Sequence, residues 1–265
     1  MKIVSVLRTG LEYGEDQARF LHDQLPPDAV CMTNLDKIKG VEAVPLQDSD
    51  LIGWWAKMEL FNPDGPLGDE DLFYIDLDTV IVGSIKPLMD AARGSRHIVM
   101  LSDFYHPQHP ASGLMYIPAR IKRRVWNAWS VNPYWFMVRH RQPGRGGDQG
   151  FVAEFAGQVI RWDELCPGAV VSYKKHIAAP GMPGYTKGVS MGDGTLPAGA
   201  VIVAFHGNPR PWDLKKCKPS LSDTTPASTG SGDSKKSSPE QQPLSIRPTK
   251  AHSKDTSRRS KSRKR

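Results

Sequence analysis

Two aspartates follow a short apolar run in the first third of the chain. Leu72–Ile75, L-F-Y-I, predicts a buried strand, and Asp76 and Asp78 come directly after it. Ligands bind at the carboxyl ends of strands in open α/β sheets, and side chains two residues apart in an extended chain point the same way. Two carboxylates held close together repel each other unless a cation lies between them. The pair therefore predicts a site for Mn²⁺ or Mg²⁺, which accepts oxygen ligands and can bridge a diphosphate.

A second group of polar residues follows a late apolar run. Val201–Phe205 predicts another buried strand, and His206, Gly207 and Arg210 come after it. An imidazole beside a metal site is a natural third ligand, so this histidine joins the two aspartates as an expected metal ligand. Gly207 lets the backbone approach a ligand closely. Arg210 can form a two-pronged contact with phosphate oxygens.

Two reactions are compatible with the acidic pair alone. In a nucleotide-sugar transferase, the pair holds a metal on the diphosphate of the donor. In a phosphohydrolase of the haloacid dehalogenase type, the pattern D-x-D-x-T/V also follows a strand, and Asp76, Asp78 and Val80 match it. Asp76 would then be a nucleophile that forms an aspartyl phosphate.

Taken together, the D-L-D-T around residue 76 and the late H-G-x-x-R-P-W resemble glycosyltransferase family 8, which includes glycogenin-like and lipooligosaccharide galactosyltransferases. The resemblance implies the GT-A fold and a metal-dependent hexosyltransferase whose donor is a nucleotide-sugar, namely a UDP-sugar. The acceptor is unknown. The late motif of the family usually reads H-x-x-G-x-x-K-P-W. Here Gly207 follows His206 directly, and Arg210 replaces the lysine.

Four further segments match the family in the same order, and besides Ser112–Met115 and Ser172–Lys174 they include two that carry expected site residues. Gly53–Phe61 is similar to the helix that carries a basic residue before the acidic pair, which implies that Lys57 faces the donor. Gly147-Asp148-Gln149 resembles the D-Q pair that lies near the donor sugar and the acceptor. The resemblance thus makes Asp148 and Gln149 the expected catalytic residues.

The residues after the first predicted strand are the expected contacts of the nucleotide. Arg8, Thr9 and Tyr13 follow Lys2–Leu7, and a GT-A fold seats the nucleotide base at that place. The ring of Tyr13 could stack on uracil, although packing in a turn would account for this residue equally well.

The position of the acidic pair counts against the phosphohydrolase. That fold normally carries its aspartates on the first strand, whereas two predicted strands precede Asp76 here. The chain also lacks a later G-D-x-x-x-D, because Gly192-Asp193-Gly194 has no second carboxylate after it. A third alternative is a GT-A domain that binds a nucleotide-sugar without turnover, and the intact acidic pair argues against it.

Apolar periodicity predicts an α/β protein. A strand at Lys2–Leu7, a helix at Gly14–Leu25 and a strand at Ala29–Thr33 form a β-α-β opening, which indicates parallel strands. With the resemblance, the expected architecture is a Rossmann-like mixed sheet of the GT-A type, flanked by helices. Further strands are predicted at 80–82, 98–101, 113–117, 170–173 and 201–205, and further helices at 51–61, 119–130 and 148–155.

An aromatic stretch with interspersed arginines allows two interpretations. Trp126, Trp129, Tyr134, Trp135 and Phe136 lie within eleven positions of one another. Aromatic rings beside cations can stack on sugars or bases, which would make this stretch a place for the acceptor. We favour the alternative, an amphipathic helix that packs its tryptophans onto the sheet.

The positive charge of the chain is concentrated at its end. The net charge is +7, and residues 219–265 hold 11 Lys and Arg against 4 Asp and Glu, so residues 1–218 are neutral. The end segment is rich in Ser, Thr and Pro and cannot bury enough apolar area to offset its ordering entropy. We therefore predict a GT-A-like domain over 1–218 and a disordered basic tail over 219–265, with weak electrostatic contact to an anionic membrane or nucleic acid as one role for the tail.

The cysteines and the absence of long apolar runs predict the compartment. The three cysteines have long spacings and no C-x-x-C, which indicates reduced thiols. No apolar stretch has the length of a signal sequence or of a membrane-spanning helix. We therefore expect a cytoplasmic protein.

Overall fold

A computed structural model describes residues 1–142 and 146–216, so the predicted tail lies outside the described residues. The strands are β1 (Lys2–Leu7), β2 (Val30–Thr33), β3 (Glu42–Pro45), β4 (Leu72–Ile75), β5 (Thr79–Ile81), β6 (Ile98–Ser102), β7 (Pro110–Ile117), β8 (Val159–Arg161), β9 (Val170–Ser172) and β10 (Ile202–Ala204). The α-helices are α1 (Glu15–His22), α2 (Lys86–Ala92), α3 (Ala119–Ser130), α4 (Pro133–His140), α5 (Gly147–Phe155) and α6 (Trp162–Leu165). Two 3₁₀ helices, η1 (Gly53–Phe61) and η3 (Pro211–Lys216), and one π-helical turn, η2 (Tyr173–Ile177), complete the described elements.

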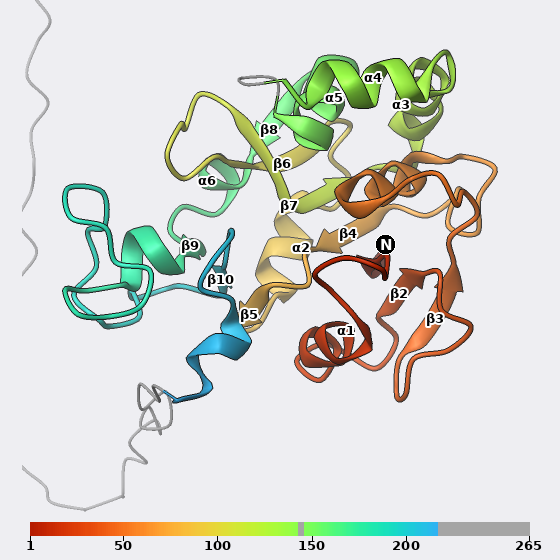
Figure 1. Cartoon of the computed structure of the whole chain (residues 1–265). Coiled ribbons are helices and arrows are strands. Elements are labelled where there is room, and N and C mark those ends of the chain that lie inside the picture. Colours follow the sequence, from red (N-terminus) through yellow and green to blue (C-terminus); the bar gives the residue numbers. More distant parts are fainter. Residues whose placement is uncertain (143–145, 217–265) are drawn as a thin grey trace, which may run out of the picture. The chain divides into compact units, whose positions relative to one another are not determined.

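Seven strands form a mixed sheet in the order β3-β2-β1-β4-β7-β6-β8 (Figure 1). The first four strands of this order run parallel to one another. β7 is antiparallel to both of its neighbours, and β8 is parallel to β6. The predicted mixed α/β sheet is therefore confirmed, and so are the parallel strands of its β-α-β opening.

The order of the strands reverses between β1 and β4. From β1 the chain moves outward through β2 to β3, and it then returns to the other side of β1 as β4. Two parallel strands whose connections leave in opposite directions open a crevice at their carboxyl ends, and this is the usual ligand site in such sheets. Arg8 is the first residue after β1, and Asp76 is the first residue after β4.

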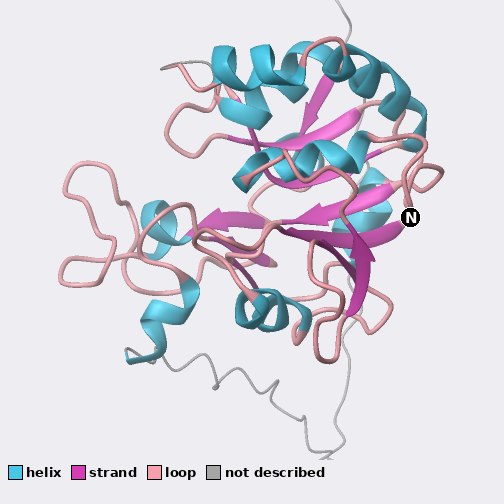
Figure 2. Ribbon diagram, turned by 45° about the vertical axis from the view of Figure 1, so that its right-hand side comes forward, coloured by secondary structure: helices cyan, strands magenta, loops and turns pink. Residues whose placement is uncertain are grey.

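Helices cover both faces of the large sheet (Figure 2). Side chains alternate along β1, so that Val4 and Val6 enter one core with η1, α3, α4 and α5, whereas Ile3 and Leu7 enter the other with α1, α2 and α6. Both cores are large and apolar, which makes the sheet a rigid support for the residues at its edge.

A smaller sheet, in the order β5-β10-β9, continues from the acidic pair. β5 begins at Thr79, directly after Asp78, and pairs with β10 in the antiparallel sense, so that Thr79 lies opposite Ala204. β9 pairs with β10 in parallel and sets Ser172 opposite Ala204. This register brings the end of β10, and with it His206, from a distant part of the sequence to the edge of the crevice.

The aromatic stretch separates into a buried part and an exposed part. Trp129 of α3 is buried and stacks on Trp55 of η1, with ring centroids 5.3 Å apart. Phe136 of α4 is also buried, against Trp129 and Phe151. Trp129 and Phe136 are thus buried, as the packing interpretation predicts, but their ring contacts are with η1 and α5, and Tyr134 and Trp135 are exposed.

Several elements differ from the predictions. α1 is shorter than the predicted 14–25, and the predicted helix at 51–61 is the 3₁₀ helix η1. η1 buries most of its side chains, because it lies in the core between the sheet and α3. The pattern did not predict β3, β8, α2, α4 or α6. These elements are short, and β3 lies at the edge of the sheet with one buried residue, so apolar periodicity gives little signal for it.

Within the described residues, no helix combines the length and the apolar character needed to cross a membrane. Cys31 and Cys166 are free thiols, as predicted for these two.

Candidate active site

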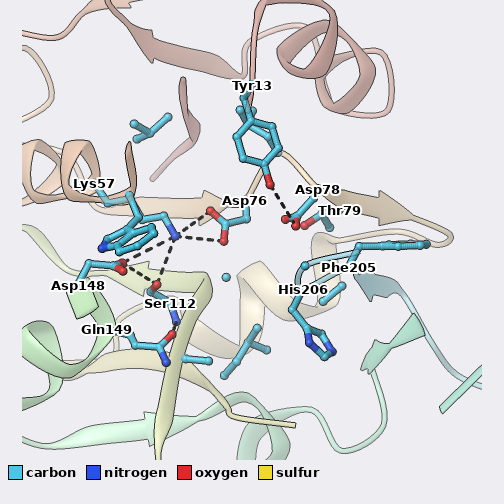
Figure 3. Close-up of a pocket in the computed structure, with 18 of the residues that line it drawn as sticks. Tyr13, Lys57, Asp76, Asp78, Thr79, Ser112, Asp148, Gln149, Phe205 and His206 are labelled. Atoms are coloured by element: carbon cyan, nitrogen blue, oxygen red, sulfur yellow. Dashed lines mark hydrogen bonds and ion pairs between the residues drawn. The ribbon is translucent and has the colours of Figure 1, made fainter. Parts of the chain in front are cut away.

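A cavity of about 560 Å³ lies at the carboxyl ends of β1 and β4 (Figure 3). Segments from across the sequence line it: the loop after β1, η1, the acidic pair, β7, the start of α5 and the loop after β10. Every predicted site residue except Thr9 belongs to the lining, namely Arg8, Tyr13, Lys57, Asp76, Asp78, Asp148, Gln149, His206, Gly207 and Arg210.

Asp76 is held by a lysine on one side and by the sheet on the other. The Nζ atom of Lys57 lies 2.9 Å from Oδ1 and 3.1 Å from Oδ2 of Asp76. The hydroxyl group of Tyr74 donates to Asp76 as well. The backbone N–H of Asp76 donates to the carbonyl of Gly113 on β7 at 3.0 Å. These contacts fix the carboxylate at the end of β4.

Lys57 also reaches the other predicted carboxylate. Its Nζ atom lies 3.7 Å from Oδ2 of Asp148 and 3.3 Å from the hydroxyl of Ser112, which donates to Asp148 at 2.7 Å. Burial alone would lower the pKa of Lys57, but Asp76 and Asp148 outweigh burial and raise the pKa, so the ammonium stays charged. Burial raises the pKa of Asp148, and Lys57 and Ser112 oppose that rise. Lys57 therefore lies between two carboxylates at the base of the cavity (Figure 3).

Two glycines set the position of Asp148. Gly146 and Gly147 have positive φ values of 74° and 60°, which side chains other than glycine rarely adopt. They turn the chain into α5, so that Asp148 and Gln149 occupy its first turn and face the cavity. The side-chain oxygen of Gln149 accepts from the backbone N–H of Ser112 at 3.3 Å. The predicted D-Q pair is thus anchored to β7 through one serine.

Asp78 is buried and is paired with an arginine. The guanidinium of Arg210 contacts Oδ2 of Asp78, and the hydroxyl of Tyr13 lies 3.4 Å from the same oxygen. Burial and the charge of Asp76 raise the pKa of Asp78, while Arg210 and Lys57 oppose that rise. The two carboxylates of the acidic pair therefore repel each other, and each is compensated by its own cation.

Arg210 joins segments from the two ends of the described chain. Its Nε and Nη2 atoms each donate to the carboxylate of Glu12 at 2.7 Å. Its guanidinium also lies over the ring of Tyr13, 5.2 Å from the centroid. The loop after β10 is thus fastened to the loop after β1 beside Asp78.

His206 is held by β9 and turned from the acidic pair. Its Nε2 atom lies 2.6 Å from the hydroxyl of Ser172, and its ring stacks on Phe104 with centroids 5.3 Å apart. Burial, aided by Lys174, lowers the pKa of His206 to about 4, so the imidazole is neutral at pH 7. Figure 3 shows the ring pointing away from Asp76 and Asp78. Among the described residues, no three His, Cys, Asp or Glu side chains converge in a way that could hold a metal ion.

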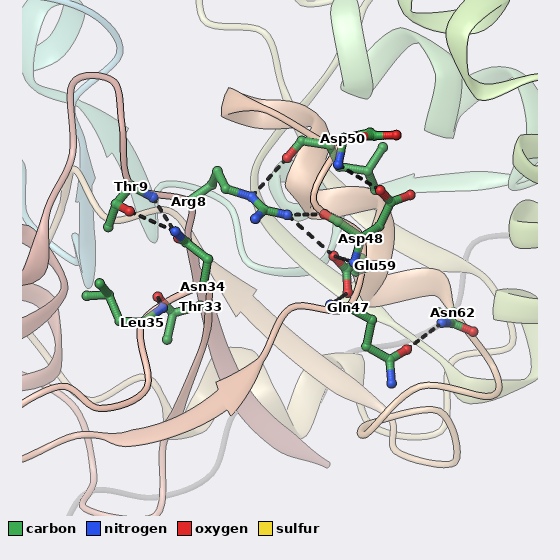
Figure 4. A network of polar contacts seen from close by, with 11 residues as sticks. Arg8, Thr9, Thr33, Asn34, Leu35, Gln47, Asp48, Asp50, Glu59 and Asn62 are labelled. Carbon is green, nitrogen blue, oxygen red and sulfur yellow. Dashed lines mark hydrogen bonds and ion pairs between the residues drawn. The ribbon is translucent and has the colours of Figure 1, made fainter.

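Arg8 and Thr9, the two residues after β1, contact neighbouring loops of the fold (Figure 4). Arg8 donates to the backbone oxygens of Asp48 and Leu51 and lies 3.9 Å from the buried carboxylate of Glu59. Its guanidinium therefore secures the loop before η1, although the side chain also lines the cavity. Thr9 exchanges hydrogen bonds with the side chain of Asn34 and does not line the cavity.

Sequence reasoning missed several lining residues. Glu12 is one, because nothing in the local pattern links it to an arginine 198 positions later. Trp54 is another, and its position one helical turn before Lys57 was a signal that the sequence offered. Phe104 and Tyr105 lie in the loop after β6 and contact the ring of His206. No pattern in the sequence marks that loop.

No family model matches the chain, and no curated protein is similar enough in sequence to be matched. Among solved structures, 32 chains match, and they include several glycosyltransferases. The galactosyltransferase LgtC, solved with donor and acceptor sugar analogs, is 13% identical over 80% of this chain and 89% of its own, with a TM-score of 0.48. The bifunctional glycosyltransferase WbbM is 12% identical over 80% of this chain and 46% of its own, with a TM-score of 0.49.

A third match is the glycosyltransferase GlyE of Streptococcus pneumoniae TIGR4, which is 14% identical over 60% of this chain and 44% of its own, with a TM-score of 0.42. These structural neighbours are of the class that the two motifs resemble. At such identities and scores, the likeness by itself assigns neither a donor nor an acceptor nor a metal to this chain.

Proposed function

We propose that the chain is a metal-dependent glycosyltransferase that transfers a hexose from a nucleotide-sugar, of the UDP type, to an acceptor still to be identified. The observation that carries this proposal is the cavity at the reversal between β1 and β4. It gathers the acidic pair, a basic residue from η1, the D-Q pair of α5 and the basic residue of the late motif. The resemblance to glycosyltransferase family 8 predicts that these residues share one site. They line one cavity although they lie far apart along the chain.

The acidic pair fits a divalent cation by its chemistry. Carboxylate oxygens are preferred ligands of Mg²⁺ and Mn²⁺, and a neutral imidazole suits Mn²⁺ as well. The raised pKa of Asp78 reflects burial and repulsion from Asp76, which a shared cation would relieve. We propose Asp76 and Asp78 as ligands, and His206 would join them as a third ligand only after its ring leaves Ser172 and turns toward the pair. A cation held there would supply positive charge that stabilises a diphosphate leaving group.

The chain's own cations support the same leaving group. Arg210 presents a planar, permanently charged group at the edge of the cavity, where its present partners are carboxylates. A diphosphate offers the same kind of oxygen acceptor, so Arg210 can exchange a carboxylate for a phosphate at small cost. Lys57 stays between Asp76 and Asp148 and compensates their charge.

We propose that the D-Q pair, which lines the cavity, contacts the donor sugar or the acceptor. Asp148 is buried and linked to Ser112 and Lys57, so its carboxylate is held in one orientation. A fixed carboxylate can accept a hydrogen bond from a sugar or acceptor hydroxyl and so orient it. Gln149 can bind a hydroxyl through its amide N–H groups, because its oxygen is occupied by Ser112.

A panel of nucleotide-sugars tests the proposed reaction. The full chain should release the nucleoside diphosphate slowly from at least one UDP-sugar when Mn²⁺ is present and should not do so with a chelator. Asp76→Asn or Asp78→Asn should remove this activity and leave the fold intact. Asp90→Asn, which changes an exposed carboxylate of α2, is the matched control.

The same samples separate the phosphohydrolase alternative. That enzyme would cleave p-nitrophenyl phosphate and trap beryllofluoride on Asp76. Both results without nucleotide binding would overturn the proposal. Nucleotide-sugar binding without any turnover, across a panel that includes simple sugar acceptors, would instead favour a binding domain that has lost catalysis.

A further inference from the structure

α4 has a second apolar face that points outward. Val131, just before the helix, and Tyr134, Trp135 and Val138 within it are 79%, 74%, 50% and 47% exposed. Val138 lies four positions after Tyr134 and three after Trp135, so these three side chains form one stripe of α4, whereas Val131 directly follows α3 and is separated from α4 by the non-helical Asn132. Three exposed apolar side chains of this size on one short helix, with Val131 just before it, are more than the scattered exposure that soluble proteins usually show.

The side chains of the stripe do not pack in the hydrophobic core. Phe136 and His140 point inward from the same helix and are buried against Phe151 of α5. α4 therefore packs on α5 through one side and leaves the stripe on the other. In the part of the chain that the structure describes, the side chains of Val131, Tyr134 and Val138 stay exposed.

The stripe lies in a strongly basic segment of a domain whose net charge, over residues 1–218, is zero. Residues 119–142 contain six Lys and Arg and no Asp or Glu. Exposed arginines stand on the outer side of α3, opposite its buried residues, at Arg120, Arg123 and Arg124. The guanidinium of Arg139 lies over the Trp135 ring, 5.1 Å from the centroid.

Two of these arginines are partly compensated from outside the segment. Arg123 lies 3.1 Å from Asp64, and both side chains are exposed. Arg139 lies 2.9 Å from Glu154. Ion pairs of this kind near the surface are weak. The side chains of Arg120, Arg124 and Arg141 are exposed as well and can meet an anionic surface.

We propose that α4 is a docking surface for an anionic lipid membrane, in which the stripe enters the interface and the arginines meet the headgroups. Tyr and Trp prefer the membrane–water interface, because one end of each ring system is apolar and the other is polar. Arginine can keep its aliphatic stem along the apolar region and its guanidinium at the headgroups. The valines favour lipid over nucleic acid, because they have no ring to stack on a base.

Vesicle co-sedimentation of the full chain tests this surface. The vesicles are pure phosphatidylcholine or phosphatidylcholine with one-third phosphatidylglycerol, at low and at physiological salt. Tyr134→Ser/Trp135→Ser should lower partitioning onto the anionic vesicles roughly tenfold. Arg120→Gln/Arg124→Gln should lower it about fivefold for each arginine removed, and mainly at low salt. All variants keep the same basic tail, so the tail contributes equally to each.

Matched controls change exposed residues outside the proposed docking surface. Met191→Ser removes an apolar side chain that is 70% exposed, and Lys86→Gln/Arg93→Gln removes two exposed cations of α2. Neither control should change partitioning by more than about twofold. Circular dichroism should give the same spectrum for all variants, because every changed side chain is on the surface.

Quenching by brominated phosphatidylcholine reports insertion directly. Tryptophan emission of the wild-type chain on anionic vesicles should be quenched, Trp135→Phe should lose most of that quenching, and Trp54→Phe should retain it. Equal partitioning of the wild type and Tyr134→Ser/Trp135→Ser would overturn the proposal. So would a stripe variant that loses affinity for a single-stranded oligonucleotide but keeps its affinity for anionic vesicles.

Discussion

The ammonium group of Lys57 lies 2.9 Å from the carboxylate of Asp76, and the lysine side chain is only 13% exposed. A buried ion pair contributes little by itself, but the loss of one partner leaves the other charge buried and unpaired. The contact thus joins the stability of the fold to the chemistry of the cavity, because Asp148 depends on the same lysine.

Lys57→Met should destabilise the chain by about 3–5 kcal/mol, because two carboxylates would lose their cation. Urea unfolding in the presence of a chelator measures this change. Lys122→Met is the matched control, since Lys122 is another buried lysine, whose ammonium donates to a backbone oxygen and not to a carboxylate. A Lys57→Met variant as stable as the wild type would show that the pair is not a supporting contact.

Arg210→Gln should lower turnover of the donor by about 10²-fold or more, because the variant lacks the permanent positive charge that we propose stabilises the leaving group. The variant also breaks the contacts with Glu12 and Asp78, so the loop after β10 should become more accessible to proteases. Steady-state kinetics with the active UDP-sugar give the first effect, and limited proteolysis gives the second. Arg93→Gln, an exposed arginine on α2, should change neither. Unaltered kinetics in Arg210→Gln would remove this residue from the proposed mechanism.

Asp148→Asn should reduce turnover by about 10²-fold and change the affinity for UDP by less than about threefold, because this carboxylate orients the sugar or the acceptor and not the nucleotide. Turnover and calorimetric UDP binding, measured on one preparation, separate the two quantities. Glu154→Gln on the same helix controls for the loss of a carboxylate from α5. Weaker UDP binding with normal turnover of bound donor would contradict the role of Asp148.

The fold should lose stability in mild acid through His22. Burial lowers the pKa of His22 from its ordinary 6.5 to about 4, and its Nε2 atom lies 2.8 Å from the hydroxyl of Ser5 on β1. Between these two pH values the unfolded chain binds a proton that the folded chain does not, so stability falls as the pH drops from 6.5 to 4 and this group adds no further loss below 4.

Thermal melting between about pH 7.5 and about pH 4.5 measures this loss for the wild type and for His22→Gln. The wild type should lose more of its melting temperature across that range than the variant does, because the variant lacks this titrating group. Parallel curves for the two proteins would show that His22 is not the source of the acid sensitivity.

The sequence was enough to predict the strands that carry the acidic pair and His206, because both are uninterrupted apolar runs. It was also enough to predict the polar residues of the acidic pair, the D-Q pair and the late motif that line the cavity, because each lies in a recognisable local pattern, whereas the lining loop after β6 carries no such pattern. The pairing of Asp78 with Arg210 and of Arg210 with Glu12 was not predictable, because it depends on β5 and β10 meeting across a large separation in sequence.

The orientation of His206 was beyond the sequence for a similar reason. Its contact with Ser172 arises from the parallel register of β9 and β10, and register is a tertiary property. For Arg8, too, the sequence predicted the position of the residue but not the direction of its side chain. Its place after β1 was predicted, but its guanidinium is directed to the loop before η1, where buried backbone oxygens need a donor.

The central claim is that the acidic pair binds a nucleotide diphosphate through a divalent cation, and calorimetric titration of UDP into the full chain tests it most directly. With Mn²⁺ present, the wild type should bind one UDP per chain. The affinity should fall by at least about tenfold when Mn²⁺ is replaced by a chelator, or when the variant is Asp76→Asn or Asp78→Asn. UDP binding that is equally tight with and without Mn²⁺ in all three proteins, or no UDP binding under any of these conditions, would contradict the account.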